Sequence, residues 1–473
     1  MEEAPDQAAE SRRNTSAMDS EPIKLHVVML PWLAMGHLFP FFELSKRLAL
    51  LGHRVSFLAS PANLRRLPVL PPSLSQLLEL VPCPLPPVEN LPENVESTVD
   101  LPSDDVRPML TQAFFSFEGR LAEFLDDPSR PKPDWIIYDM IANNWVPALA
   151  ARHRVSCAYF GLFNAAILCF FGKFLGYDSP KQLTVVPEWI PLPTTVVFTP
   201  FEARQIFPML PKGSSSDQSR ALRGSFMAIR TCRVFEPEWL DLLGKIHVGY
   251  PIVPVGFLPP SFDDGDSSQT WVRISAWLDQ NREPGSVVFA AFGSEVKLTL
   301  EQIEEIAAGL ERSEVPFLWA LRAGSPPAGF ADRTGGRGLV VEGWVPQARL
   351  LAHESVGGFL THGGWNSIVE GLTAGVALVV LPMQFEQGLN ARLLEEKGLG
   401  FEVVRGREDG LISGEEIARK LRAAMAEEED GEGLRARARK GKERFGGEEM
   451  QGKYMEEFVK HLWENRGGNC QED

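Results

Sequence analysis

The sequence predicts an α/β protein made of two facing doubly wound parallel-sheet domains. Its 473 residues are too many for one ordinary core, so two domains of roughly 200 residues are expected. Short apolar runs alternate with amphipathic segments, a pattern typical of strand–helix–strand units with parallel strands. This pattern stops in a Pro-rich middle section and starts again after the low-complexity stretch Pro259–Gln269.

The first domain opens on the apolar run Leu25–Pro31, which is expected to be a strand. The amphipathic segment Phe41–Leu51 predicts a helix, and RVSFLAS after Gly52-His53 predicts the second strand. The run Trp135–Met140 is interpreted as a further buried strand that ends at Asp139.

The second domain repeats the alternation. Strands are predicted in SVVFAAFGS, PFLWALR, GLVVEGWV, GGFLTH and ALVVLPM, and a helix in Leu300–Glu311. The expected division is a disordered tail at 1–22, a first domain at 23–258, a linker at 259–270, a second domain at 271–440, and a C-terminal helix at 441–473 that packs back on the first domain.

Composition excludes several classes of partner. Lys and Arg number 47 against 63 Asp and Glu, a net charge of −16, which argues against nucleic acid and anionic membranes. The most apolar stretch, Val155–Phe171, is short for a bilayer span and contains polar interruptions. The N-terminus has no apolar run typical of a secretory signal. A cytoplasmic, monomeric protein is expected.

The stretch THGGWNSIVE, residues 361–370, predicts a phosphate site. It follows a strand and opens a helix, and ligands of open α/β sheets bind at the carboxyl ends of strands. A helix N-terminus offers unpaired N–H groups, and Gly363 and Gly364 allow close approach to the backbone. Polar side chains that can contact phosphate or ribose lie on both sides of the glycines, at His362, Asn366, Ser367 and Glu370. These ten residues alone fit an ordinary capped helix equally well.

The surroundings favour a nucleotide sugar. Upstream, Trp344 offers a flat ring for a base, with the amide of Gln347 beside it. Downstream, the strand ALVVLPM ends in a carboxylate and an amide, Glu386 and Gln387, which can bracket vicinal sugar hydroxyls.

The segment Trp344–Gln387 resembles, throughout its length, the C-terminal signature box of plant family-1 UDP-glycosyltransferases. The segment agrees with the box in length and in the Trp and Gln at its start. It also contains the HxGWNSxxE motif in the middle and an acidic residue followed by Gln at the end. The resemblance extends from about Lys24 to Trp463 and implies the GT-B type of the fold. Two positions depart from the commonest pattern: Gly363 stands in place of Cys, and Glu386 in place of Asp.

The resemblance also implies a role for each matching residue. Trp344, followed by Val345, is expected to stack on uracil; Gln347 and Glu370 to contact the ribose; His362, Asn366, Ser367 and Ser294 to hold the diphosphate; and Glu386 and Gln387, with Trp365 beside them, to hold the sugar.

A catalytic pair is predicted in the first domain. His37 lies in the loop after the first strand, at the start of a helix, and an imidazole that titrates near neutral pH suits a general base. Asp139 ends another strand of the same sheet and can orient the base. A lone histidine there is more often a core or capping residue, but both positions match the family's catalytic dyad. The resemblance implies direct displacement with inversion, without a metal or other cofactor, the UDP-sugar being a co-substrate.

Two motif matches are set aside because their context is wrong. Asp264-Gly265-Asp266 has the form of a metal-binding DxD but lies in the Ser/Asp/Gly-rich linker. Gly431–Ala436 fits GxGxxA but follows an acidic run instead of a strand.

The segment Pro187–Thr195 and the residues after the box resemble one plant subgroup, which adds a 1,2-linked branching sugar to flavonoid, terpenoid or steroid glycosides. UDP-glucose and UDP-rhamnose are both expected donors, and an apolar glycoside is the expected acceptor. Glycosylation of a bare aglycone remains the alternative. Candidate pocket aromatics are Phe114, Phe115, Phe163, Phe170, Phe171 and Phe174.

Two other classes were considered. A nucleotide-sugar oxidoreductase or epimerase needs a GxGxxG after the first strand, which PWLAMGHLFP lacks. An inactive binding protein is expected to have lost the base or its acid, and His37 and Asp139 are both present.

Overall fold

The computed structural model describes residues 24–172, 177–210, 223–261, 268–280, 283–426 and 433–467. The predicted tail, Asp264-Gly265-Asp266 and the start of the GxGxxA match therefore lie outside the described residues, as does half of the predicted linker, residues 262–267.

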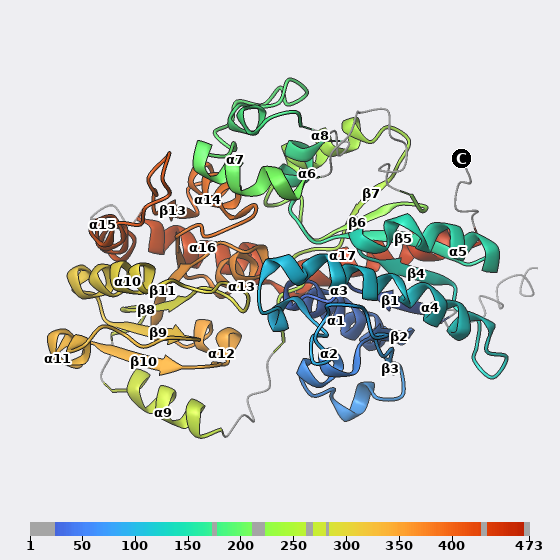
Figure 1. Cartoon of the computed structure of the whole chain (residues 1–473), viewed down its shortest axis with the longest axis horizontal. Coiled ribbons are helices and arrows are strands. Elements are labelled where there is room, and N and C mark those ends of the chain that lie inside the picture. Colours follow the sequence, from blue (N-terminus) through green and yellow to red (C-terminus); the bar gives the residue numbers. More distant parts are fainter. Residues whose placement is uncertain are drawn as a thin grey trace, which may run out of the picture.

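Two parallel sheets form the centre of the molecule (Figure 1). The first has the order β3-β2-β1-β4-β5-β6-β7 and the second β10-β9-β8-β11-β12-β13. Strand order reverses between β1 and β4 and between β8 and β11, which is the doubly wound topology the sequence predicted. The strands are β1 (His26–Leu30), β2 (Arg54–Ala59), β3 (Leu78–Pro82), β4 (Trp135–Tyr138), β5 (Ser156–Gly161), β6 (Met227–Ile229), β7 (Ile252–Pro254), β8 (Val287–Ala291), β9 (Phe317–Leu321), β10 (Gly338–Glu342), β11 (Val356–Thr361), β12 (Ala377–Val380) and β13 (Gly400–Glu402).

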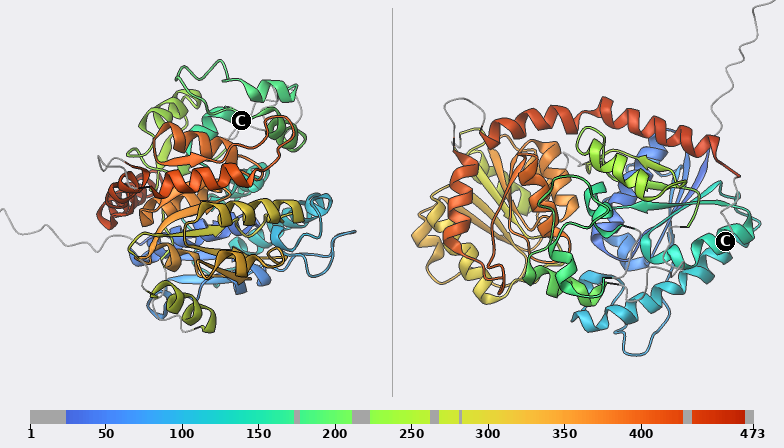
Figure 2. Two further views of the ribbon diagram at one scale, coloured as in Figure 1. Left: turned by 90° about the vertical axis from the view of Figure 1, so that its left-hand side faces the viewer. Right: turned by 90° about the horizontal axis from the view of Figure 1, so that it is seen from above.

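Helices cover both faces of each sheet (Figure 2), so the central strands β1, β4 and β8 are fully buried and, apart from His26, made of apolar or aromatic residues. The helices are α1 (Met35–Leu50), α2 (Pro61–Arg66), α3 (Arg107–Phe115), α4 (Phe117–Asp126), α5 (Val146–His153), α6 (Ala165–Phe171), α7 (Pro200–Ile206), α8 (Pro237–Ile246), α9 (Gln269–Leu278), α10 (Leu300–Ser313), α11 (Phe330–Thr334), α12 (Gln347–Leu351), α13 (Trp365–Ala374), α14 (Gln387–Glu396), α15 (Gly414–Met425), α16 (Leu434–Gly446) and α17 (Glu448–Glu464).

The last helices run along both domains (Figure 2). Helix α16 packs against α13 of the second domain, and α17 packs against α1 and β7 of the first. The indole Nε1 of Trp135 in β4 donates to the carbonyl of Leu462 at 3.0 Å, so the end of the chain is attached to the first sheet.

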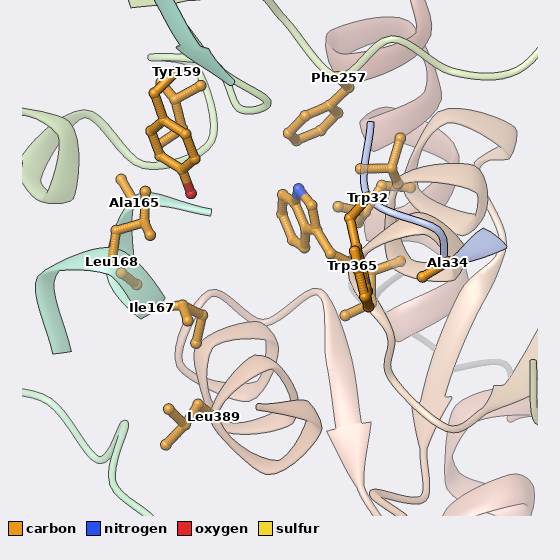
Figure 3. Packing of buried hydrophobic residues seen from close by; sticks show 14 of the residues in the cluster. Trp32, Ala34, Tyr159, Ala165, Ile167, Leu168, Phe257, Trp365 and Leu389 are labelled. Carbon is orange, nitrogen blue, oxygen red and sulfur yellow. The ribbon is translucent and has the colours of Figure 1, made fainter. Parts of the chain in front are cut away.

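Buried apolar side chains continue from one domain into the other. Figure 3 shows part of this contact: Trp365 of the second domain lies near Phe257 and Trp32 of the first, and Leu389 of α14 lies next to Ile167 of α6. Within the described residues, no helix is long and apolar enough to cross a membrane. The two domains are thus held together by a shared apolar core.

The first helix begins earlier than predicted. The expected start was Phe41, but α1 begins at Met35 and contains Pro40. Proline has no backbone N–H, so the carbonyl four residues earlier, that of Gly36, has no helical donor. The amphipathic pattern begins only at Phe41, but the expected position of His37 at the start of a helix is confirmed, since it lies in the first turn of α1.

Candidate active site

A cavity of about 1250 Å³ lies between the carboxyl ends of the two sheets. Both domains line it. From the first come His37 and Arg230, and the second contributes most of the residues singled out in the sequence: Ser294, Trp344, Val345, Gln347, His362, Trp365, Asn366, Ser367, Glu370 and Glu386. Asp139 and Gln387 do not line the cavity.

His37 and Asp139 form a hydrogen-bonded pair. His37 lies in the first turn of α1, and Asp139 directly follows β4, the neighbour of β1. The imidazole Nδ1 is 2.7 Å from a carboxylate oxygen of Asp139. Asp139 is 1% exposed and also accepts from the backbone N–H of Trp32 at 3.1 Å and of Met140 at 2.6 Å. These bonds fix the carboxylate against the histidine.

The pair leaves one imidazole nitrogen available to the cavity. A carboxylate only accepts hydrogen bonds, so Nδ1 of His37 carries the proton and Nε2 has the free lone pair. Burial, the largest influence, lowers the pKa of His37, but attraction to Asp139, the hydrogen bond, and the nearby Glu295 and Glu386 outweigh it and raise the pKa overall. The imidazole is therefore a stronger base than a free histidine.

His362, Gly363 and Gly364 connect β11 to α13, and Gly364 lines the same cavity as His37. Gly363 has φ +87°, and a Cβ there would lie 2.5 Å from the side chain of Val380. Both the backbone conformation and the lack of space therefore require glycine at this position. Gly364 is the N-cap residue of α13 and offers no side-chain cap. The first N–H groups of this helix consequently lack a side-chain capping partner and can bind an anion.

Gln347, Ser367 and Glu370 come together on the second domain. The amide Nε2 of Gln347 donates to the carboxylate of Glu370 at 2.9 Å and to Oγ of Ser367 at 3.3 Å. Burial raises the pKa of Glu370 to about 7, although the Gln347 bond and the charge of Arg230 act in the opposite direction. The group offers carboxylate and hydroxyl oxygens that suit ribose hydroxyls.

His362 is neutral near pH 7, since burial lowers its pKa to about 4. Its ring fills the space beside two glycines: a Cβ at Gly293 or Gly364 would lie 2.7 or 2.6 Å from it. A neutral imidazole in this position can donate a hydrogen bond to a phosphate oxygen.

Asn366 joins the two domains. Its Nδ2 donates to the carbonyl of Gly36 at 3.0 Å, the carbonyl that Pro40 leaves without a helical donor. Its oxygen accepts from the guanidinium of Arg230. Arg230, 2% exposed, also donates to the carbonyls of Phe257 and Leu258.

Trp344 is 60% exposed and presents a flat ring at the cavity. The guanidinium of Arg322 lies 5.1 Å from its ring centroid, and Phe39 of the first domain is 6.5 Å away, centroid to centroid. Val345 and Ser294 also line the cavity, Ser294 in the loop after β8. The indole is thus positioned to stack on a flat ligand.

Glu386 and Gln387 are differently placed. Glu386 faces the cavity, and burial raises its pKa to about 7 against the opposing charge of His37. Gln387 uses its Oε1 to accept from the backbone N–H groups of Met383 and Gln384, both at 2.9 Å. Its oxygen therefore holds the turn between β12 and α14.

Trp365 packs mainly at the domain boundary. Its Nε1 donates to the carbonyl of Arg230 at 2.9 Å, and its ring centroid lies 5.7 Å from that of Phe257 in an edge-on arrangement, seen in Figure 3.

Comparison with known proteins decides the family. Residues 268–428 match the family described as UDP-glucoronosyl and UDP-glucosyl transferase. The chain is 43% identical over 463 residues to UDP-glycosyltransferase 91C1 of Arabidopsis thaliana, covering 94% of this chain and 98% of the relative. The chain belongs to the plant family-1 UDP-glycosyltransferases. The family, the enzyme class and the GT-B fold expected from the sequence are confirmed.

Two further relatives of this glycosyltransferase are informative. Soyasaponin III rhamnosyltransferase of Glycine max is 38% identical, with 93% of this chain and 96% of the relative covered. The crystal structure of Arabidopsis thaliana UGT89C1 complexed with UDP-L-rhamnose superposes with a TM-score of 0.73 at 27% identity, covering 93% of this chain and 99% of that chain.

The aromatic residues proposed for the acceptor side of the glycosyltransferase divide into two groups. Phe115, Phe163 and Phe171 line the cavity, whereas Phe114 and Phe170 are fully buried in the core. Phe174 lies outside the described residues.

Sequence reasoning missed Arg230, Arg322 and Glu295, which all line the cavity of this glycosyltransferase. Arg230 directly follows β6, and Arg322 directly follows β9. The rule that located Asp139, polar residues at the carboxyl ends of parallel strands, was sufficient to find Arg322, which ends the predicted strand PFLWALR. It could not find Arg230, because β6 was not predicted. Among the described residues, no group of three or more His, Cys, Asp or Glu is placed to hold a metal ion.

Proposed function

We propose that the enzyme transfers glucose or rhamnose from its UDP-sugar, with inversion, to a sugar hydroxyl of a flavonoid, terpenoid or steroid glycoside. In this proposal the region 23–258 binds the acceptor, the region 271–440 binds the donor, and no cofactor takes part. The observation that carries it is the His37–Asp139 pair facing the N-terminus of α13 across one cavity.

The reaction begins with the acceptor hydroxyl at Nε2 of His37. As His37 removes the hydroxyl proton, the oxygen attacks the anomeric carbon from the side opposite UDP. The bond between that carbon and the β-phosphate oxygen breaks, and UDP departs with the electron pair. Asp139 stabilises the imidazolium that forms. The N–H groups at the start of α13 and the neutral imidazole of His362 stabilise the charge on the departing diphosphate.

The donor is assigned along the second domain. Uracil stacks on Trp344 beside Val345, and the ribose hydroxyls bind Gln347 and Glu370. The diphosphate binds at His362, Asn366, Ser367 and Ser294. The sugar lies next to Glu386 and Trp365. Gln387 contributes indirectly, because its side chain fixes the turn between β12 and α14 that carries Glu386.

Two features support a glycoside acceptor. The cavity of about 1250 Å³ must hold the donor as well as the acceptor, so its composition and not its volume is informative. Its first-domain lining combines apolar side chains, among them Phe115, Phe163 and Phe171, with polar ones such as Thr111 and Gln112. Glu295 of the second domain also lines the cavity and lies near His37. An apolar aglycone can occupy the wall with its sugar among the polar groups. The similarity to soyasaponin III rhamnosyltransferase agrees with this assignment.

A transfer assay tests the proposal. UDP-glucose and UDP-rhamnose are each combined with bare aglycones and with their monoglycosides, and products are identified by mass spectrometry beside His37→Ala. We expect a gain of one hexose or deoxyhexose on glycosides only, lost in the variant. Transfer to bare aglycones alone would refute branching and favour the alternative, an aglycone glycosyltransferase.

A further inference from the structure

Asn390 of α14 is buried behind the loop that is proposed to bind the diphosphate. It is 1% exposed and does not line the cavity. Its Nδ2 donates to the carbonyl of Gly363 at 3.0 Å. Gly364, one residue on, lines the cavity and begins α13. Asn390 therefore holds one side of the loop while the other side faces the substrate.

The hydrogen bond fixes the direction of the next N–H group. The peptide between Gly363 and Gly364 is trans, so its C=O and N–H point in opposite directions. With the carbonyl held toward Asn390, the N–H of Gly364 points away from it, toward the cavity side of the loop. Glycines on both sides of this peptide make its rotation easy, so without a fixed partner the N–H loses its direction.

The acceptor domain in turn holds Asn390. Asn164, fully buried, donates from Nδ2 to Oδ1 of Asn390 at 2.8 Å. The Oδ1 of Asn164 accepts from the backbone N–H of Ile167 at 3.0 Å, which caps α6. The carbonyl of Gly363 binds Nδ2 of Asn390 and the N–H of Ile167 binds Oδ1 of Asn164. The orientation of both side-chain amides is therefore fixed, with Nδ2 of Asn164 facing Oδ1 of Asn390.

Helix α6 is a firm support for this chain of bonds. The buried carboxylate of Glu236 accepts from the backbone N–H groups of Ala165 and Ala166 at 2.7 and 3.0 Å. The same helix presents Leu168 and Phe171 to the cavity, and Figure 3 shows it against Leu389 of α14. Helix α6 therefore forms part of the cavity wall and also supports, through Asn164 and Asn390, the loop before α13.

We propose that Asn390 is a positioning residue which directs the Gly364 N–H at the donor diphosphate, and that Asn164 holds it in place from the acceptor domain. The inference rests on the proposed placement of UDP at the start of α13. The role is distinct from that of the signature residues that face the cavity, because Asn390 acts on the backbone from behind.

Isosteric substitutions test each bond. Asn390→Asp keeps an oxygen for Asn164 but places a second oxygen against the Gly363 carbonyl. Asn164→Asp keeps the cap of α6 and removes the donor to Asn390. Asn63→Asp is the matched control: Asn63 is equally buried and donates to Ser60 and Glu96, but it does not line the cavity.

UDP affinity is measured by calorimetry, and kcat and KM for donor and acceptor are measured separately. For Asn390→Asp we expect weaker UDP binding and a fall in kcat of about 10²-fold, as for loss of one oxyanion donor. The KM for the acceptor is expected to stay unchanged. Asn164→Asp shows the same pattern to a lesser degree, and the double variant is less than additive. Asn63→Asp lowers thermal stability only.

The outcomes separate the two proposals. If the wild-type enzyme itself fails to bind UDP, the proposed function is wrong. If the wild type binds UDP and both Asn164→Asp and Asn390→Asp bind it as tightly as the wild type does, the inference is wrong. A loss in Asn164→Asp no greater than that in Asn63→Asp also overturns it, and this comparison holds even where Asn390→Asp fails to fold.

Discussion

The side chain of Asn366 in the second domain donates a hydrogen bond to the backbone carbonyl of Gly36 in the first, at 3.0 Å. This carbonyl is available because Pro40, four residues on, has no N–H to complete the helical bond. The bond joins the helix that carries His37 to the helix whose N-terminus faces it. Arg230 holds the amide of Asn366 in the required orientation, since a guanidinium only donates.

Replacing Pro40 is expected to stabilise the protein while impairing the enzyme. Pro40→Ala restores a backbone N–H that competes with Asn366 for the Gly36 carbonyl. The melting temperature rises, because a proline inside a helix costs up to about 3 kcal/mol relative to alanine. The value of kcat falls by about tenfold or less, since one hydrogen bond contributes about 0.5–1.5 kcal/mol net. Calorimetry and steady-state kinetics measure both, and an unchanged kcat in the stabilised variant contradicts the prediction.

Arg230→Met is expected to lower both stability and activity. It removes a buried cation bonded to two backbone carbonyls and to Asn366, and it leaves Glu370 without its nearby positive charge. Breaking such a buried interaction typically costs about 3–5 kcal/mol. Thermal unfolding and UDP affinity are the measurements. Arg204→Met, at an exposed pair with Glu408, is the control and should change neither by much.

Asp139→Asn tests the orientation of the base. The amide can donate to Nδ1 of His37 and so favours the tautomer with the proton on Nε2, where the acceptor hydroxyl must bind. We expect kcat to fall by about 10²- to 10⁴-fold. Because Asp139 contributes to the raised pKa of His37, the acid limb of the pH–rate profile moves to lower pH in the variant. An acid limb that stays in place would show that another group titrates there.

Much of this site could be predicted from the sequence because its parts are local. His37 and Asp139 follow apolar strands, and the topology of a parallel sheet brings the ends of adjacent strands together. The glycines before α13 indicate a close backbone approach for the same local reason. In each case a short stretch contains both the element and the polar residue at its end.

The remaining features depend on contacts between the domains, which local patterns do not encode. Asn164 meets Asn390 across 226 positions, and Arg230 meets Asn366 across 136. The bond from Gln387 to its own turn is local, but nothing in the residue type distinguishes it from a sugar contact. The predicted domain limits stay predictions, as half of the linker, residues 262–267, is outside the described residues.

Trp344 is expected to contribute to nucleotide affinity without contributing to stability. It is 60% exposed, so its removal leaves no cavity in a core. Base–aromatic stacking is worth about 1–3 kcal/mol, and Trp344→Ala should weaken UDP binding by about tenfold or more, with Trp344→Phe intermediate. Calorimetry with UDP tests this, and the melting temperature of both variants should equal that of the wild type. Equal UDP affinity in the wild type and both variants would show that the indole of Trp344 does not stack on uracil.

Donor binding is expected to strengthen as pH rises, through Glu370. Burial raises the pKa of this carboxyl to about 7, and ribose hydroxyls donate best to the ionised form. Binding therefore favours the charged carboxylate and releases a proton below pH 7, so affinity increases between about pH 6 and 8, by at most tenfold per unit. The same raised pKa lowers the stability of the free protein over this range, since the folded state binds more protons than the unfolded state.

The measurement is calorimetry with UDP-glucose, whose diphosphate diester does not titrate in this range, in buffers of different ionisation enthalpy. Glu370→Gln is expected to bind more weakly at pH 8 and to lose part of the pH dependence, since the pKa of Glu386, which is proposed to contact the sugar, is also raised to about 7. The control is Glu402→Gln, at a carboxyl whose pKa burial also raises to about 7 but which lies outside the cavity and pairs with Arg392. If the pH dependence is undiminished in Glu370→Gln and disappears in Glu402→Gln, the effect reflects the stability of the second domain and not a contact with the ribose.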